Sequence, residues 1–90
     1  MTTLIELKNI SDAAHVSFLI AKDALNLFRI AWGDAYSVCN AAKGDVAINA
    51  AYDNLVASHA AYKIAHAAYD VDLTNADVTY AAYAAARVAI

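Results

Sequence analysis

Residues that break α-helices are nearly absent from this chain. It contains no proline and two glycines, Gly33 and Gly44, whereas alanine, the strongest helix former, supplies 24 of its 90 residues. Hydrophobic residues make up 62% of the chain, which is enough apolar surface to offset the entropy lost on folding. The sequence therefore predicts an all-α fold, and its length predicts a single domain over residues 1–90.

Capping signals predict where the helices begin. Thr3 and Glu6 have the spacing of a capping box, which predicts a short N-terminal helix through about Lys8 and a joint at residues 9–11. A second helix is expected to follow and to reach about Trp32. Apolar residues cover most of its circumference, so we expect it to be buried on nearly every side. A further helix is expected from Asp45 to about residue 70.

Segment 70–77 leaves the number of long helices open. Asp72 and Thr74 are good N-cap residues, and Thr74 and Asp77 have the spacing of a second capping box. A break there gives a last helix from about residue 75 to the C-terminus, whereas without it one helix continues. The expected architecture is a small helical bundle of two or three long helices plus a short N-terminal helix.

Aspartates recur at eleven-residue intervals, at Asp12, Asp23, Asp34 and Asp45. Eleven residues make three helical turns, so in one unbroken helix these carboxylates would lie along one edge. The pairs Gly33-Asp34 and Gly44-Asp45 also fit a glycine that ends one helix and an aspartate that caps the next. We expect this second arrangement for at least Gly44-Asp45.

Charge and cysteine content argue against several functions. Nine acidic residues against six basic ones give a net charge of −3, which disfavours nucleic acid and anionic membrane surfaces as partners. Cys39 is the only cysteine, so an intramolecular disulfide or a thiolate-rich metal site cannot form, and a cytoplasmic location is expected. No stretch of 18 residues is both apolar and uncharged, so no membrane-spanning helix is expected.

A seven-residue repeat runs through the C-terminal half, where His-Ala-Ala-Tyr occurs at residues 59–62 and 66–69. It places tyrosines and histidines in two neighbouring heptad columns, and such rings are enriched at protein interfaces. We predict a partner-binding face formed by Tyr52, His59, Tyr62, His66, Tyr69, Tyr80 and Tyr83. The opposite, alanine-rich face is expected to pack inside the molecule. The tyrosine stripe also fits a half-exposed helix surface.

The same residues give little reason to predict catalysis. His59 and His66 are seven residues apart, about 10 Å along a helix axis, which is too far for both to chelate one ion from the same helix. His66 and Asp70 have a suitable spacing but no third ligand. We expect no metal, no cofactor and no catalytic residues, and interpret the C-terminal aspartates as helix caps. A metal-dependent enzyme is the least favoured alternative.

The unit Ala-Ala-Tyr recurs at residues 50–52, 60–62, 67–69 and 81–83. In this respect the C-terminal half resembles the short, alanine- and tyrosine-rich helical proteins of tailed bacteriophages. The resemblance implies an inhibitor in the host cytoplasm that binds and blocks a host or defence protein. From the two apolar faces we expect a non-enzymatic protein-interaction module that forms a homodimer. The alternative is a structural subunit of a homo-oligomeric helical assembly.

Overall fold

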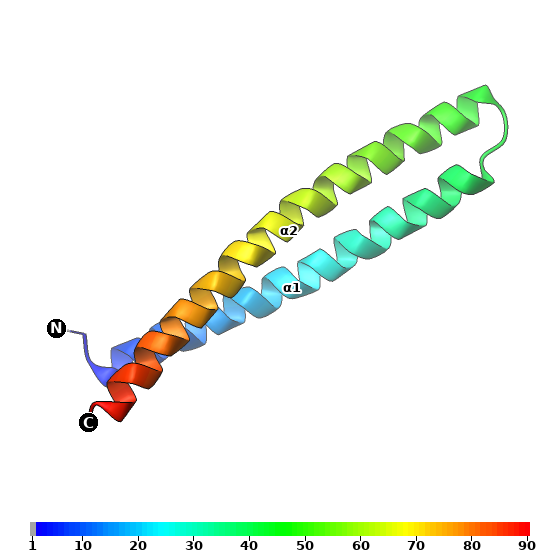
Figure 1. Cartoon of the computed structure of the whole chain (residues 1–90). Helices are drawn as coiled ribbons and strands as arrows, with labels where there is room; N and C mark the ends of the chain where they lie inside the picture. The colour runs from blue at the N-terminus through cyan, green and yellow to red at the C-terminus, as the bar shows by residue number, and fades with distance from the viewer. Residues whose placement is uncertain (1) are drawn as a thin grey trace. The chain divides into compact units, whose positions relative to one another are not determined.

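In a computed structural model, which describes residues 2–90, the chain forms two long α-helices joined as a helical hairpin (Figure 1). Helix α1 covers Leu4–Ala41 and helix α2 covers Asp45–Val88. The all-α prediction is confirmed. Of the two alternatives left open, two long helices are observed, because α2 continues through residues 70–77. The separate short N-terminal helix is wrong, because α1 continues through residues 9–11.

Local hydrogen bonds explain why one predicted cap forms and the other does not. The amide of Glu6 donates to Oγ1 of Thr3 at 3.1 Å, so the first capping box forms just before α1. The hydroxyl of Thr74 instead donates to the carbonyl of Asp70 at 3.0 Å, inside α2. A hydroxyl that is satisfied by the preceding helical turn does not compete for a new helix start, and no glycine or proline lies nearby to force one.

The connection between the helices ends at Gly44, which has a φ of +89°. Its carbonyl accepts a hydrogen bond from the amide of Ile48 at 2.9 Å, so Gly44 occupies the N-cap position of α2. Asp45 is then the first helical residue, where a carboxylate is favoured by the helix dipole. The predicted turn at Gly44-Asp45 is therefore confirmed, but the predicted capping role of Asp45 is wrong, because Gly44 itself is the N-cap residue. Gly33 lies inside α1, so Asp34 is not a cap.

Alanine substitution at the two glycines is expected to change stability in opposite directions. A Cβ atom at Gly33 meets nothing within 4 Å, so Gly33→Ala should raise the free energy of unfolding by about 1 kcal/mol through helix propensity. Gly44→Ala places a Cβ-bearing residue at a φ of +89° and should lower it by about 1 to 2 kcal/mol. Urea unfolding followed by circular dichroism measures both changes. Shifts of the same sign would contradict these assignments.

The chain comprises two compact units. The first combines the chain up to Lys22 with Ala68–Ile90, and the second is Asp23–Ala67. In the first unit the rings of Phe18 and Tyr69 lie 5.4 Å apart, and in the second those of Trp32 and Tyr62 lie 5.1 Å apart. Within each unit, α1 and α2 therefore pack against each other through large aromatic side chains.

Small residues form the best-buried part of each unit. The buried residues are Ser11 and Ala14 in the first unit and Ala35, Ala51 and Ala65 in the second. In α2 of the second unit they alternate with larger, half-buried residues three or four positions apart, at Ala51, Leu55, Ser58, Tyr62 and Ala65. This is heptad spacing, in which small residues let two helix backbones approach closely while larger ones cover the gap.

The expectation that residues 12–32 would be buried on nearly every side is wrong. Val16 and Ile20 in the first unit, and Leu27 and Ile30 in the second, are exposed. Within its unit, each stretch of α1 has one neighbouring stretch of α2 to pack against, so one face is covered and the others meet solvent. Over residues 2–90, neither helix contains a segment long and apolar enough to cross a membrane.

Candidate functional site

The predicted tyrosine and histidine face is divided between the helix interface and the surface beside it. Its half-buried members are His59, Tyr62, Tyr69 and Tyr83, and its exposed members are Tyr52, His66 and Tyr80. Tyr52 is 58% exposed and Tyr80 is 57% exposed. The face therefore serves both to join α1 to α2 and to present rings to solvent, and its contact with a partner stays a prediction.

Trp32 gathers three of these residues in the second unit. Its ring centroid lies 4.6 Å from that of His59 and 5.1 Å from that of Tyr62, and Tyr62 in turn lies 5.9 Å from His66. Such tilted ring pairs stabilise beyond the area that they bury. Sequence reasoning treated Trp32 as one apolar residue of a buried helix and missed this role. Its heptad spacing with the buried Ala35 is the signal that points to it.

The alanine-rich face of α2 does not pack inside the molecule, contrary to the prediction. Ile64 of the second unit and Val71 and Val78 of the first are exposed on it. The buried alanines, Ala51 and Ala65, belong instead to the column beside Tyr62. The physical reason is area, because rings that pack on the large side chains of α1 remove more apolar surface from water than alanines do.

Each unit has two edges, one on either side of its helix interface. Residues one position after an inward-facing residue lie on one edge, and residues one position before it lie on the other. In the first unit the following positions carry most of the charged side chains, and we call them the polar edge. They are Ile5, Lys8, Asp12, His15, Leu19, Lys22, Asp70, Leu73, Asp77, Tyr80, Ala84 and Arg87. In the second unit the following positions include Tyr36, Tyr52, His59 and His66.

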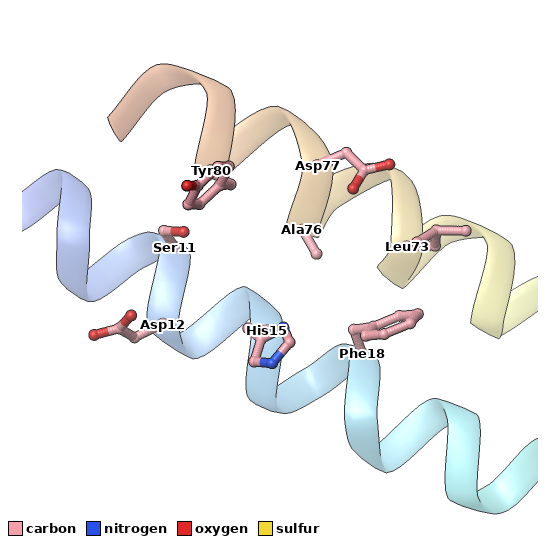
Figure 2. A pocket seen from close by; sticks show the side chains of 8 residues that line it. All are labelled: Ser11, Asp12, His15, Phe18, Leu73, Ala76, Asp77 and Tyr80. Atoms are coloured by element: carbon pink, nitrogen blue, oxygen red, sulfur yellow. The ribbon is translucent and has the colours of Figure 1, made fainter. Parts of the chain in front are cut away.

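The polar edge of the first unit contains a groove of about 450 Å³ (Figure 2). The residues that line it are Ser11, Asp12, His15 and Phe18 of α1 and Leu73, Ala76, Asp77 and Tyr80 of α2. Figure 2 shows Phe18 and Ala76 pointing into the space between the helices, whereas Asp12 points away from α2. The groove thus combines an apolar floor with two carboxylates, an imidazole and a phenol at its rim.

One carboxylate at this rim already holds a cation. Nζ of Lys8 donates to Oδ2 of Asp12 at 2.8 Å. This hydrogen bond, followed by the attraction of the carboxylate charge, raises the pKa of Lys8 above its ordinary value of 10.5. Folding favours the protonated form of Lys8. The contribution of this ion pair to the free energy of unfolding is therefore full below pH 10.5 and is lost as the pH rises through the raised pKa. Both side chains are exposed, so the pair adds little stability.

The acidic, histidine and cysteine side chains are the ones that could bind a metal ion. Among residues 2–90, no three of these side chains are placed to hold a metal ion together. Cys39 is a half-buried free thiol.

The positions before the inward-facing residues form an edge of different chemistry in the first unit. From residue 10 onward it consists of Ile10, Ala13, Ser17 and Ile20 of α1 and Ala68, Val71, Asn75, Val78, Ala82 and Ala85 of α2, and we call these ten residues the apolar edge. None of the ten is charged, and Glu6 lies before them at the start of α1. On the corresponding edge of the second unit, Val38, Asn54 and five alanines line a hollow of about 520 Å³.

Comparisons of the chain with protein-family models, with curated proteins and with solved structures gave no match. The resemblance to alanine- and tyrosine-rich phage proteins therefore stays a prediction.

Proposed function

We propose that the protein is a small, non-enzymatic protein-interaction module that binds a protein partner through its exposed tyrosines. The observation that carries this proposal is the exposure of Tyr52 and Tyr80, both on α2, to more than half of their surface. Tyrosine, tryptophan and arginine side chains supply most of the binding energy at protein interfaces. A ring held on a helix loses little conformational entropy when it binds, which favours such a surface for recognition.

The groove on the polar edge favours a partner that offers a basic side chain. Asp77 and Tyr80 supply polar atoms at the rim, and Phe18 supplies an apolar floor. A lysine or arginine of the partner can place its hydrocarbon stem over the ring and its charged end beside the carboxylate. The resemblance to phage proteins adds a narrower proposal, in which the partner is a host or defence protein that is blocked by binding.

A second candidate function is that of a subunit in a homo-oligomeric helical assembly. The observation that favours it is the exposure of large apolar side chains on outward positions, such as Val16 in the first unit and Ile30 in the second. Surfaces of this kind support contacts between copies that do not close on themselves and so extend into fibres.

Substituting single tyrosines tests the leading proposal. We expect Tyr52→Ala and Tyr80→Ala each to weaken partner binding by about tenfold or more, because both rings are exposed anchors. The full-length chain would be used to capture and identify a partner from producing cells, and binding of the purified pair would then be measured by calorimetry. Ile64→Ala is the control, since Ile64 is also exposed, to 73%, but lies outside the predicted tyrosine and histidine face.

Two outcomes would count against this proposal. One is a purified partner that binds both tyrosine variants as tightly as the wild-type chain. The other is capture of nothing except further copies of the chain, which would favour the assembly subunit instead.

A further inference from the structure

The apolar edge of the first unit leaves large side chains in water. Ile20 is 65% exposed, Val71 is 68% exposed and Val78 is 61% exposed, and Ile10 is exposed beside them. The two isoleucines are ten residues apart on α1 and the two valines are seven residues apart on α2, and smaller uncharged residues lie between them at three- and four-residue intervals. The first unit thus carries a helix-packing surface on which none of its described residues packs.

We propose that a second copy of the chain packs on this apolar edge, with the two α2 segments antiparallel around a two-fold axis. This surface is separate from the polar edge and from the exposed tyrosines. The dimer can therefore form whether or not the protein binds another partner, and the two proposals can fail independently.

The apolar edge of α2 is complementary to the same edge of a second copy when the two helices run antiparallel. Its two valines are each flanked by smaller residues, in the order Ala68, Val71, Asn75, Val78, Ala82 and Ala85. A two-fold axis between residues 76 and 77 places Val71 opposite Ala82 and Val78 opposite Asn75, so each valine meets a smaller residue on the other copy. In a two-fold interface both halves make the same contacts, so this match occurs twice.

The surface of α2 is also hollowed where the partner's side chains would enter. A hollow of about 440 Å³ is lined by Asp70, Val71, Thr74, Asn75 and Val78. Knobs-into-holes packing needs such spaces between side chains of one helix to receive a side chain of the other. Asn75 lies within the hollow, and a single polar residue in an apolar helix interface fixes the register at some cost in stability.

The distribution of charge favours the same occupant. The basic side chains of the first unit, Lys8, Lys22 and Arg87, lie on the polar edge together with His15. Packing two apolar edges together therefore leaves these basic groups in water, and the charged group beside the interface is the carboxylate of Asp70, which lines the hollow. A strip about 25 Å long and two helices, about 20 Å, wide on each copy buries roughly 1,000 Å² in total. That area is at the lower limit for a specific interface, so we expect a dimer that dissociates at micromolar concentrations.

Sedimentation equilibrium of the full-length chain tests this inference. Between about 5 and 500 μM we expect the wild-type mass to rise from that of a monomer to that of a dimer. Val71→Lys and Ile20→Lys should each raise the dissociation constant by at least about tenfold, because an ammonium group would be desolvated in the interface. Ala81→Lys is the matched control, since it adds the same charge at an exposed position of α2 outside the apolar edge.

Asn75→Ala provides a variant with the opposite expected effect. It removes the polar amide and keeps a small residue opposite Val78, so it should lower the dissociation constant several-fold. Circular dichroism at low concentration checks that all variants keep their helix content. A wild-type chain that stays monomeric at the highest concentration would overturn the inference, as would dimerisation unchanged in both lysine variants. Tyr80→Ala should dimerise normally, which separates this result from a failure of the proposed partner binding.

Discussion

Trp32→Ala is expected to lower the free energy of unfolding by about 2 to 4 kcal/mol, the largest effect of any single side-chain truncation in the second unit. The Trp32 ring contacts both His59 and Tyr62, so its removal deletes two ring pairs between α1 and α2 at once. Each such pair contributes about 0.5 to 1.5 kcal/mol beyond the apolar area that it buries. Trp32 is only half-buried, which places the expected loss below the upper limit for a tryptophan in a closed core.

Urea unfolding followed by circular dichroism measures this loss without relying on tryptophan fluorescence. Tyr36→Ala is the control, because Tyr36 lies one turn further along α1 but is exposed. It should change the free energy of unfolding by less than about 0.5 kcal/mol. Trp32→Phe keeps one aromatic ring, so the loss in its free energy of unfolding should lie between those of Trp32→Ala and Tyr36→Ala. If Trp32→Ala cost no more than Tyr36→Ala, the ring cluster would not be what holds this unit together.

Ala65→Leu is expected to lower the free energy of unfolding by about 1 to 3 kcal/mol through overpacking. Ala65 is 9% exposed and lies three residues after Tyr62, where α2 meets α1. A larger side chain there must push the helices apart, and this would weaken the contacts of Trp32 as well. The substitution adds apolar volume and removes none, so a change in hydrophobicity alone would not lower the free energy of unfolding. A loss of stability would therefore show that α1 and α2 lie too close together at Ala65 to admit a larger side chain.

Ala67→Leu is a closely matched control for this experiment. It makes the same chemical change two positions away, at an exposed site of the same helix, and leucine and alanine have similar helix propensities. We expect its stability to stay within about 0.5 kcal/mol of the wild-type chain. A stabilising effect of Ala65→Leu would mean that the two helices are not in close contact at this position.

The helices could be predicted from composition, but their number could not. Thr74 has the residue type and the spacing of a helix start, yet its hydroxyl bonds to the carbonyl of Asp70 within a continuous α2. Both uses of a threonine hydroxyl are local and differ by little in free energy, so the sequence around residue 74 does not choose between them. Continuous packing along α2 decides the outcome.

The predicted tyrosine and histidine face was partly informative about the candidate site. The heptad column of Tyr62 and Tyr69 was recognised, but three of the seven residues of that face pack on α1. His59 and Tyr62 contact Trp32, and Tyr69 contacts Phe18. The sequence could not decide this, because α2 has apolar residues on two faces and either could turn inward. The choice depends on the side chains that the other helix presents at the same level.

The sequence by itself determined that the chain is helical, that α1 begins after the Thr3 and Glu6 capping box, and that a turn lies at Gly44. These features depend on hydrogen bonds and backbone angles within a few residues. The tertiary structure alone decided which heptad positions of each helix face the other helix within each unit. That choice in turn decides which edges expose charged, aromatic or valine side chains. That choice belongs to packing between residues far apart in the chain, such as Trp32 with Tyr62, and is invisible in either helix alone.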